Sequence, residues 1–108
     1  MNNAATGVPG PATKASRQAV EKTFAVNVYG PLSVIQSVVP VMPRGGRIIN
    51  IGSVGSKLGT PESPIYVASK GAMDALIFAM AKEVCVPPPQ MLVLGCGVPD
   101  IHIATVGP

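Results

Sequence analysis

The sequence has few of the features that are typical of proteins that bind nucleic acids or membrane surfaces. Only 12% of its 108 residues are charged, 4% are aromatic and none is tryptophan. The formal charge of +3 arises from eight basic side chains that are spread along the chain. Nucleic acids and anionic membranes are recognised by clustered basic residues, so we expect neither as a partner.

Cysteine and histidine are also scarce. Cys85 and Cys96 are separated by ten residues, and His102 is the one histidine. This spacing does not match a zinc site, so no metal site is expected. The sequence shows neither a signal peptide nor an apolar run that approaches a membrane span. Because two free thiols are typical of a reducing compartment, we expect a cytoplasmic location and no membrane partner.

Apolar residues, glycine and proline are abundant instead. Apolar residues make up 47% of the chain, and there are 12 glycines and 12 prolines. This composition is typical of the core of a domain with little of its charged surface. At this length the chain is at most one small domain, and we treat residues 1–108 as part of a larger one.

Residues 45–84 contain the clearest structural pattern. Residues 47–51 (RIINI) form a β-branched run, which predicts a buried parallel strand. From Pro64 to Val84, apolar and small residues recur every three or four positions, which predicts a helix. A strand followed by a helix of this kind indicates an α/β fold.

Three side chains in this segment suggest acid–base chemistry. Ser53 follows the strand, Tyr66 lies thirteen positions later, and Lys70 is one helical turn beyond Tyr66. A phenol is a poor acid at neutral pH unless its anion is stabilised, and a nearby ammonium group and hydroxyl can do this. The alternative is that Tyr66 and Lys70 are merely an aromatic side chain and a solvated lysine.

The segment resembles the catalytic core of the short-chain dehydrogenase/reductase family, with its Ser…Tyr-x-x-x-Lys signature. The similarity covers residues 2–84 and resumes at residue 101, and within the family the chain is similar to 3-oxoacyl-carrier-protein reductases and fungal-type polyketide ketoreductases. It implies an α/β fold that is a central fragment of a Rossmann-like, doubly wound parallel sheet. The fragment would hold about strands four to six and two intervening helices. It would lack the N-terminal βαβ units and the C-terminal strand.

The resemblance also implies roles for individual residues. Tyr66 would be the general acid/base, Lys70 would stabilise the phenolate and hold the nicotinamide ribose, and Ser53 would orient the substrate oxygen. Asn27, in a motif similar to the family's Phe-x-Val-Asn, would sit at a local helix distortion and help hold a proton-relay water. The alternative for Asn27 is a helix-interior asparagine that bonds local backbone.

The implied cofactor is NAD(P)(H), with NADPH expected, and the implied substrate is a small carbonyl compound or alcohol. Asn3 and Ala4 match the family's Asn-Asn-Ala-Gly motif and would lie along the cofactor with Tyr66 and Lys70. The glycine-rich dinucleotide-binding turn, however, occurs nowhere in the sequence. We therefore expect weak or absent cofactor binding.

Other segments are predicted with less support from the resemblance. A helix should begin near residue 13, with Thr13 or Ser16 as its N-cap, and continue to residue 39 with a kink or break at Gly30–Pro31. Residues 55–63 should form a flexible, substrate-facing loop. Residues 85–100 are interpreted as an aberrant insert with no obvious place to be buried, and residues 101–108 as the segment of the next strand.

Two further interpretations stay open. Half of a doubly wound sheet buries little apolar surface, so this chain could be an inactive, truncated fragment. It could also be an interaction module that joins a relative through the helices that contain Asn27 and Tyr66. A homodimer or tetramer is expected only of an intact protein.

Overall fold

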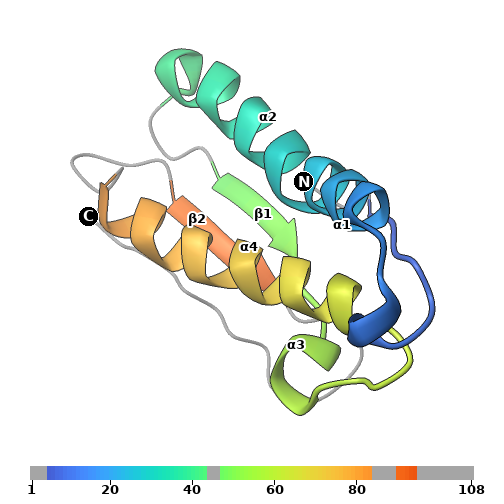
Figure 1. Cartoon of the computed structure of the whole chain (residues 1–108). Coiled ribbons are helices and arrows are strands. Elements are labelled where there is room, and N and C mark those ends of the chain that lie inside the picture. The colour runs from blue at the N-terminus through green and yellow to red at the C-terminus, as the bar shows by residue number, and fades with distance from the viewer. Residues whose placement is uncertain (1–4, 44–46, 84–89, 95–108) are drawn as a thin grey trace.

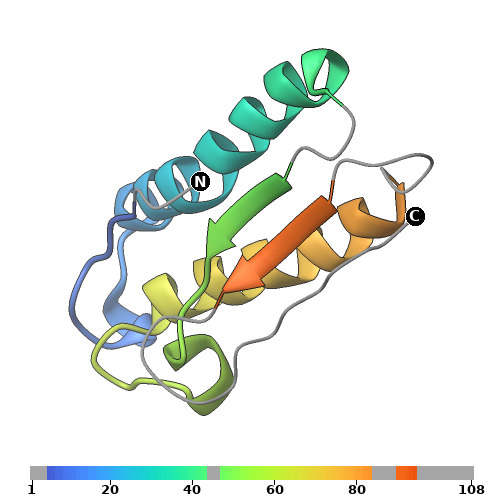
Figure 2. The ribbon, with the colours of Figure 1, turned by 180° about the vertical axis from the view of Figure 1, so that it is seen from behind.

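Two parallel strands and two long helical runs form the framework of the chain (Figure 1). This computed structural model describes residues 5–43, 47–83 and 90–94. Strand β1 (Arg47–Ile51) pairs with strand β2 (Gln90–Leu94), and helix α4 (Pro64–Glu83) connects them. The view from behind in Figure 2 has the strands in front of α4, so the sheet and the helices form two layers.

The strand and helix predicted around the candidate site are confirmed. Strand β1 has the predicted bounds, and α4 covers Pro64–Glu83, while Val84, the last residue of the predicted helix, lies outside the described residues. The strands pair in parallel, with Arg47 opposite Gln90 and Ile51 opposite Leu94. The sheet therefore has the predicted parallel α/β character, with two strands among the described residues.

The interpretation of residues 85–100 needs correction. Gln90–Leu94, which lies inside the supposed insert, forms β2 along the edge of β1. The physical reason is that an unpaired strand edge offers a row of backbone donors and acceptors, and an extended apolar segment can satisfy them. Residues 101–108, which were matched to the next strand and include His102, lie outside the described residues.

The first helical run begins at Ser16 and is continuous to Val41. Ser16 is its N-cap, since the Ser16 hydroxyl accepts a hydrogen bond from the Ala19 amide at 3.1 Å. Short 3₁₀ turns precede and end the run. The elements are η1 (Ala12–Lys14), α1 (Arg17–Phe24), η2 (Ala25–Tyr29), α2 (Gly30–Val38) and η3 (Val39–Val41). Of the two predicted N-cap residues, Ser16 is confirmed and Thr13 is not.

A kink or break was predicted at Gly30–Pro31, and the structure instead has a π-helical turn just before these residues. A proline inside an α-helix lacks a donor, and its ring would collide with the carbonyl four residues earlier, which here belongs to Asn27. Element η2 widens the helix at this point, and the Gly30 amide bonds to the Ala25 carbonyl five residues back. The helix thus passes the proline without ending.

This helical run has a second property that the sequence analysis did not anticipate. By length and composition alone, Arg17–Val41 could cross a membrane. Core helices of soluble proteins meet the same criterion, so the property decides little by itself. The absence of a membrane partner therefore stays a prediction.

The apolar core lies between the sheet and the two helical runs. Its buried members are Ile35 of α2, Ile48 of β1, and Met73 and Ile77 of α4. Met73 and Ile77 are four residues apart, so they project from the same face of α4. Half-buried apolar residues surround them, namely Val28, Val39, Met42, Leu76 and Met80. This small core holds α4, and with it the candidate site, against β1.

Replacing Ile77 with alanine tests this core. Ile77 is fully buried, so Ile77→Ala should lower the free energy of unfolding by about 2–5 kcal/mol in urea titrations. Val41 is 79% exposed, so Val41→Ala is the matched control and should change it by less than about 0.5 kcal/mol. Equal effects of the two substitutions would contradict the assigned core.

Candidate active site

A sharp corner after β1 presents Ser53. The Ser53 hydroxyl accepts a hydrogen bond from the Gly55 amide at 3.2 Å. A Cβ atom at Gly55 would lie 3.2 Å from Thr60 Oγ1 and 3.4 Å from Ser53 Oγ, so the corner closes tightly around this glycine. Gly55 also begins helix α3 (Gly55–Leu58), and the prediction that residues 55–63 form only a flexible loop is therefore wrong.

Helix α4 holds Lys70 beneath the ring of Tyr66. Lys70 Nζ donates to the carbonyl oxygen of Ile51 at 3.0 Å and lies 5.8 Å from the centroid of the Tyr66 ring. The lysine is buried, and a buried ammonium group requires compensating polar contacts. The bond to Ile51 fixes this charge at the carboxyl end of β1, beside the serine corner.

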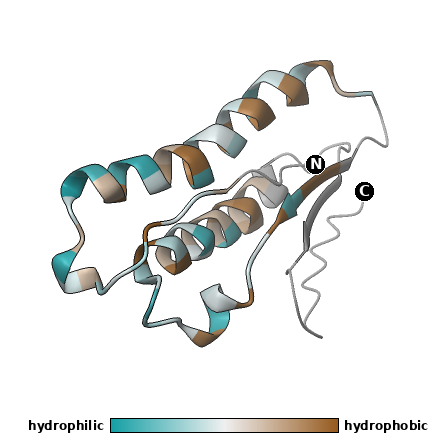
Figure 3. Ribbon diagram, turned by 90° about the vertical axis from the view of Figure 1, so that its right-hand side faces the viewer, coloured by the Kyte–Doolittle hydropathy of each residue, from teal (hydrophilic) through white to brown (hydrophobic). Residues whose placement is uncertain are grey.

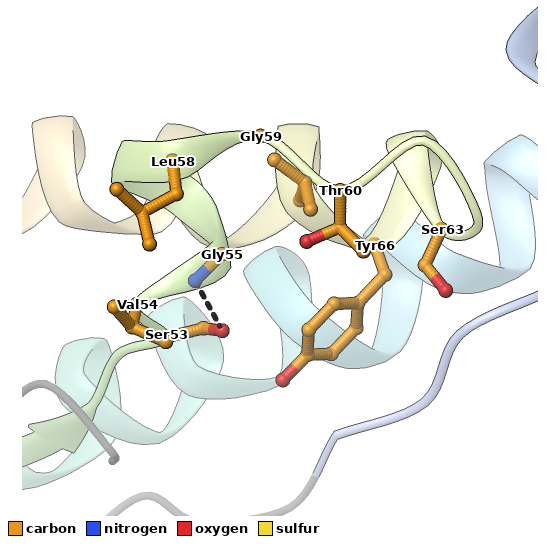
Figure 4. A pocket seen from close by; sticks show the side chains of 9 residues that line it. Ser53, Val54, Gly55, Leu58, Gly59, Thr60, Ser63 and Tyr66 are labelled. Atoms are coloured by element: carbon orange, nitrogen blue, oxygen red, sulfur yellow. Dashed lines mark hydrogen bonds between the residues drawn. The ribbon is translucent and has the colours of Figure 1, made fainter. Parts of the chain in front are cut away.

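Ser53 and Tyr66 line the same pocket, which has a volume of about 340 Å³. Figure 4 shows the Ser53 hydroxyl and the phenol end of Tyr66 on the same side of it. The other lining residues come from α3, from the following turn and from the start of α4: Val54, Gly55, Leu58, Gly59, Thr60, Ser63 and Val67. The pocket thus combines hydroxyl groups with apolar walls, and no charged side chain is among its lining residues. Such a lining suits an uncharged carbonyl or alcohol group.

Asn27 lies in the π-helical turn η2 and is almost completely buried, with 1% of its surface exposed. Its side-chain oxygen accepts from the Thr6 amide at 2.8 Å. Its side-chain nitrogen donates to the Thr6 carbonyl at 2.7 Å and to Ser69 Oγ at 2.8 Å. The carboxamide therefore joins residue 6 to α4, and the predicted helix distortion is present at this asparagine.

Ser69 is a residue of the site that the sequence analysis missed. It is fully buried, and its hydroxyl donates to the Tyr66 carbonyl at 2.7 Å while it accepts from Asn27. Through this serine, Asn27 is connected to the helical turn that carries Tyr66. Its position three residues after Tyr66 was the available signal, since residues at this spacing share a helix face.

The segment that follows Thr6 crosses the Tyr66 ring. A Cβ atom at Gly7 would lie 3.1 Å from Tyr66 Cβ and 3.2 Å from its Cδ2, so any larger residue here would require the ring or the segment to shift by a few tenths of an ångström. Further along, the Gly10 amide donates to the Glu62 carbonyl at 2.9 Å. The segment is therefore fixed on both sides of the tyrosine and restricts the ring.

Two predicted site residues remain. Asn3 and Ala4, which were predicted to contact the cofactor, lie outside the described residues. Among the residues that are described, no group of three or more His, Cys, Asp or Glu side chains could hold a metal ion.

Comparison with known proteins adds independent information. Residues 1–87 match the family described as short chain dehydrogenase. A 3-ketodihydrosphingosine reductase from Bacteroides thetaiotaomicron is 36% identical over 86 residues, which make up 78% of this chain and 32% of that protein. The chain thus spans about a third of the length of this relative.

Solved structures show the same α/β fold. The angucycline C-6 ketoreductase LanV with bound NADP superposes with a TM-score of 0.77 at 28% identity, over 87% of this chain and 36% of that one. A 4-hydroxyisoleucine dehydrogenase complexed with NADH gives a TM-score of 0.81 at 28% identity, over 90% of this chain and 41% of that one. Both are similar to this chain along most of its length.

The contacts of Ser69 can be tested by a matched pair of serine substitutions. Ser69→Ala leaves one side-chain hydrogen of buried Asn27 without its acceptor, so the free energy of unfolding should fall by about 1–3 kcal/mol. Ser37 is exposed and bonds only to the Ser33 carbonyl of its own helix, so Ser37→Ala should change it by less than about 0.5 kcal/mol. If urea titrations show that Ser69→Ala changes the free energy of unfolding as little as Ser37→Ala does, the hydrogen bond from Asn27 to Ser69 contributes little to stability.

A second pair of substitutions tests the contact of Gly7 with Tyr66. Gly7→Ala should displace the ring or the crossing segment and lower the free energy of unfolding by about 1–3 kcal/mol. Replacing Tyr29, the other tyrosine, with phenylalanine leaves Tyr66 as the reporter in near-ultraviolet circular dichroism. In this background, Gly7→Ala should change the Tyr66 signal. Gly71 lies within α4, and a Cβ there meets no described atom within 4 Å. Gly71→Ala should therefore stabilise the helix by about 0.5–1 kcal/mol and leave the tyrosine signal unchanged.

Proposed function

The chain belongs to the short-chain dehydrogenase family, and we propose that Ser53, Tyr66 and Lys70 form its site for interconverting a carbonyl and a secondary alcohol with NAD(P). One observation carries this proposal. Ser53 and Tyr66 line one pocket, and the buried Lys70 ammonium group lies 5.8 Å from the Tyr66 ring. These are a hydroxyl donor, a phenol and a fixed positive charge around a space that can admit a substrate.

In the proposed reduction, the Tyr66 hydroxyl gives its proton to the substrate oxygen. Lys70 stabilises the negative charge that then remains on the phenol, because its buried ammonium group lies beside the Tyr66 ring and favours the anion. The Ser53 hydroxyl donates to the same substrate oxygen and holds the carbonyl in place. When bound, NAD(P)H supplies the hydride to the carbonyl carbon.

The residues present fit one end of such a cofactor. The Lys70 ammonium group and the hydroxyls of Tyr66 and Ser53 are suitable partners for ribose hydroxyls and an uncharged nicotinamide, and we assign Asn3 and Ala4 to the same surface. The sequence contains no glycine-rich turn to hold the phosphates. We therefore propose weak or absent binding by this chain alone, with NADPH preferred over NADH. LanV was solved with NADP and the 4-hydroxyisoleucine dehydrogenase with NADH, so these structures support the use of NAD(P) without favouring either form.

Asn27 is proposed to help hold the water that carries protons between Lys70 and solvent. Its carboxamide already bonds to Thr6 and Ser69, so we assign this role to its backbone carbonyl in η2. A π-helical turn supports the assignment, since it alters the backbone bonding pattern and often occurs at functional sites.

A second candidate function is pairing of helices between subunits. Large apolar side chains are exposed along the first helical run and at Phe78 of α4, and Figure 3 shows apolar stretches on the first run. The exposed residues on the two runs are Val26, Tyr29, Val34, Val38, Val41 and Phe78. We propose that an intact protein buries this surface in a homodimer or tetramer, and that it acts in the cytoplasm on a small molecule. The 108-residue chain by itself would then be an inactive fragment or an interaction module.

Replacing Tyr66 tests the catalytic proposal. The chain is incubated with NADPH and a neutral ketone, and the loss of NADPH absorbance is followed. Tyr66→Phe removes the transferable proton and should lower the rate by about 10²–10⁴-fold. Tyr29 is exposed and is not among the residues that line the pocket, so Tyr29→Phe is the matched control and should retain the rate.

Two results would count against the proposal. An unchanged rate in Tyr66→Phe would show that the proton comes from another group. Failure of the unsubstituted chain both to bind NADPH and to reduce any ketone would favour the inactive-fragment alternative.

A further inference from the structure

Asp74 is a buried carboxylate that the proposed chemistry does not use. It lies on α4 and has 7% of its surface exposed. The Ser56 hydroxyl donates to Asp74 Oδ2 at 2.9 Å, and Lys57 Nζ lies 3.6 Å from the same oxygen. A carboxylate is rarely buried without compensating contacts, and here both of these partners come from the α3 segment.

Asp74 shares a helix face with the candidate catalytic residues. Tyr66, Lys70 and Asp74 are spaced by four residues, so each lies almost directly above the previous one on α4. Each of them meets the chain at or after the end of β1. Tyr66 lines the same pocket as Ser53, Lys70 bonds to the carbonyl of Ile51, the last residue of β1, and Asp74 bonds to Ser56 of α3.

The connection continues from Ser56 to Ser53. The Ser56 hydroxyl also lies 2.6 Å from the backbone carbonyl oxygen of Ser53, and its single hydrogen is shared between this oxygen and Asp74. Only one short side chain thus separates the Asp74 carboxylate from the backbone of the candidate catalytic serine.

Helix α3 depends on such an anchor. It has four residues, and an isolated helix of that length is not stable in water. Gly55 and Leu58 of α3 line the pocket, as does Val54 just before it. Whatever fixes α3 therefore fixes one wall of the pocket together with Ser53.

We propose that Asp74 is a positioning residue that holds Ser53 and the α3 wall of the pocket in place relative to Tyr66. It acts through the Ser56 hydroxyl, and its consequence for catalysis rests on the function proposed above. The ion pair with Lys57 is secondary, because the Lys57 side chain is 48% exposed and such pairs contribute little in water.

A fluorescence experiment tests the positional effect without any need for activity. The chain has no tryptophan, so Tyr29→Phe leaves Tyr66 as its only tyrosine and its fluorescence as the reporter. In this parent, quenching by acrylamide measures how open the pocket is. Asp74→Ala and Ser56→Ala should each raise the quenching constant toward that of the urea-unfolded chain while far-ultraviolet circular dichroism stays native-like.

The other variants separate the hydrogen bond from the charge. Asp74→Asn keeps an oxygen that can accept from Ser56, so it should restore the quenching of the parent. Lys57→Gln removes only the ion pair and should behave like the parent. The double variant Ser56→Ala/Asp74→Ala should equal either single variant, because both substitutions break the same link.

Reduction kinetics then test the catalytic consequence. Asp74→Ala and Ser56→Ala should lower kcat/KM for a neutral ketone by about tenfold, which is the loss expected for one charge-assisted hydrogen bond. KM for NADPH should not change, and Asp74→Asn should stay close to the unsubstituted chain.

The outcomes distinguish this inference from the proposed function. If the chain reduces no ketone but the quenching pattern is as expected, the proposed function fails and the positioning role stands. If Asp74→Ala and Ser56→Ala are folded and have the same acrylamide quenching constant as the parent, the positioning role is wrong. It is equally wrong if the effects of the two substitutions add. Should Asp74→Ala fail to fold, Ser56→Ala and Asp74→Asn still decide the matter.

Discussion

The hydrogen bonds of the Asn27 carboxamide hold three distant parts of the chain together. They join Thr6, the π-helical turn η2 and Ser69 of α4 in a buried setting. A buried donor or acceptor that loses its partner costs about 1–3 kcal/mol, so these segments cannot shift independently. Because Thr6 is fixed in this way, Gly7 is carried onto the Tyr66 ring. The geometry of the proposed acid/base thus depends on an asparagine in another helix.

The parts of the fold that the sequence predicts well are those with strong local signals. Strand β1 is a β-branched run, Ser16 is a typical N-cap, and α4 has a regular apolar repeat. The misjudged parts, α3 and β2, depend on partners that are distant in sequence. Ser56 of α3 bonds to Asp74 of α4, and β2 pairs with the edge of β1. No local pattern encodes these partners. The helix distortion at Asn27 was predicted, and its π-helical form follows from the local conflict between Pro31 and Asn27.

The same distinction applies to the candidate site. The spacing of Ser53, Tyr66 and Lys70 singled out these residues from the sequence, and the structure brings them together around one corner. Spacing on α4 places Ser69 and Asp74 near Tyr66 and Lys70 but does not reveal their roles. These roles, and that of Gly7, lie in contacts across 42, 18 and 59 residues of sequence, with Asn27, Ser56 and Tyr66 respectively. The proposed catalytic residues can be recognised from a sequence motif, whereas the residues that position them can be recognised only from their contacts in the structure.

The spacing of four residues along α4 has a further physical consequence. It stacks a phenol, an ammonium group and a carboxylate on one helix face that is mostly buried, which is unfavourable for each charge alone. Opposite charges four residues apart on a helix stabilise one another, and the polar groups just after β1 satisfy both. The face can therefore be buried only when β1, Ser53 and α3 are in place. Folding of this corner and assembly of the proposed site are then one event, which explains how so small a core can still hold a site in a definite shape.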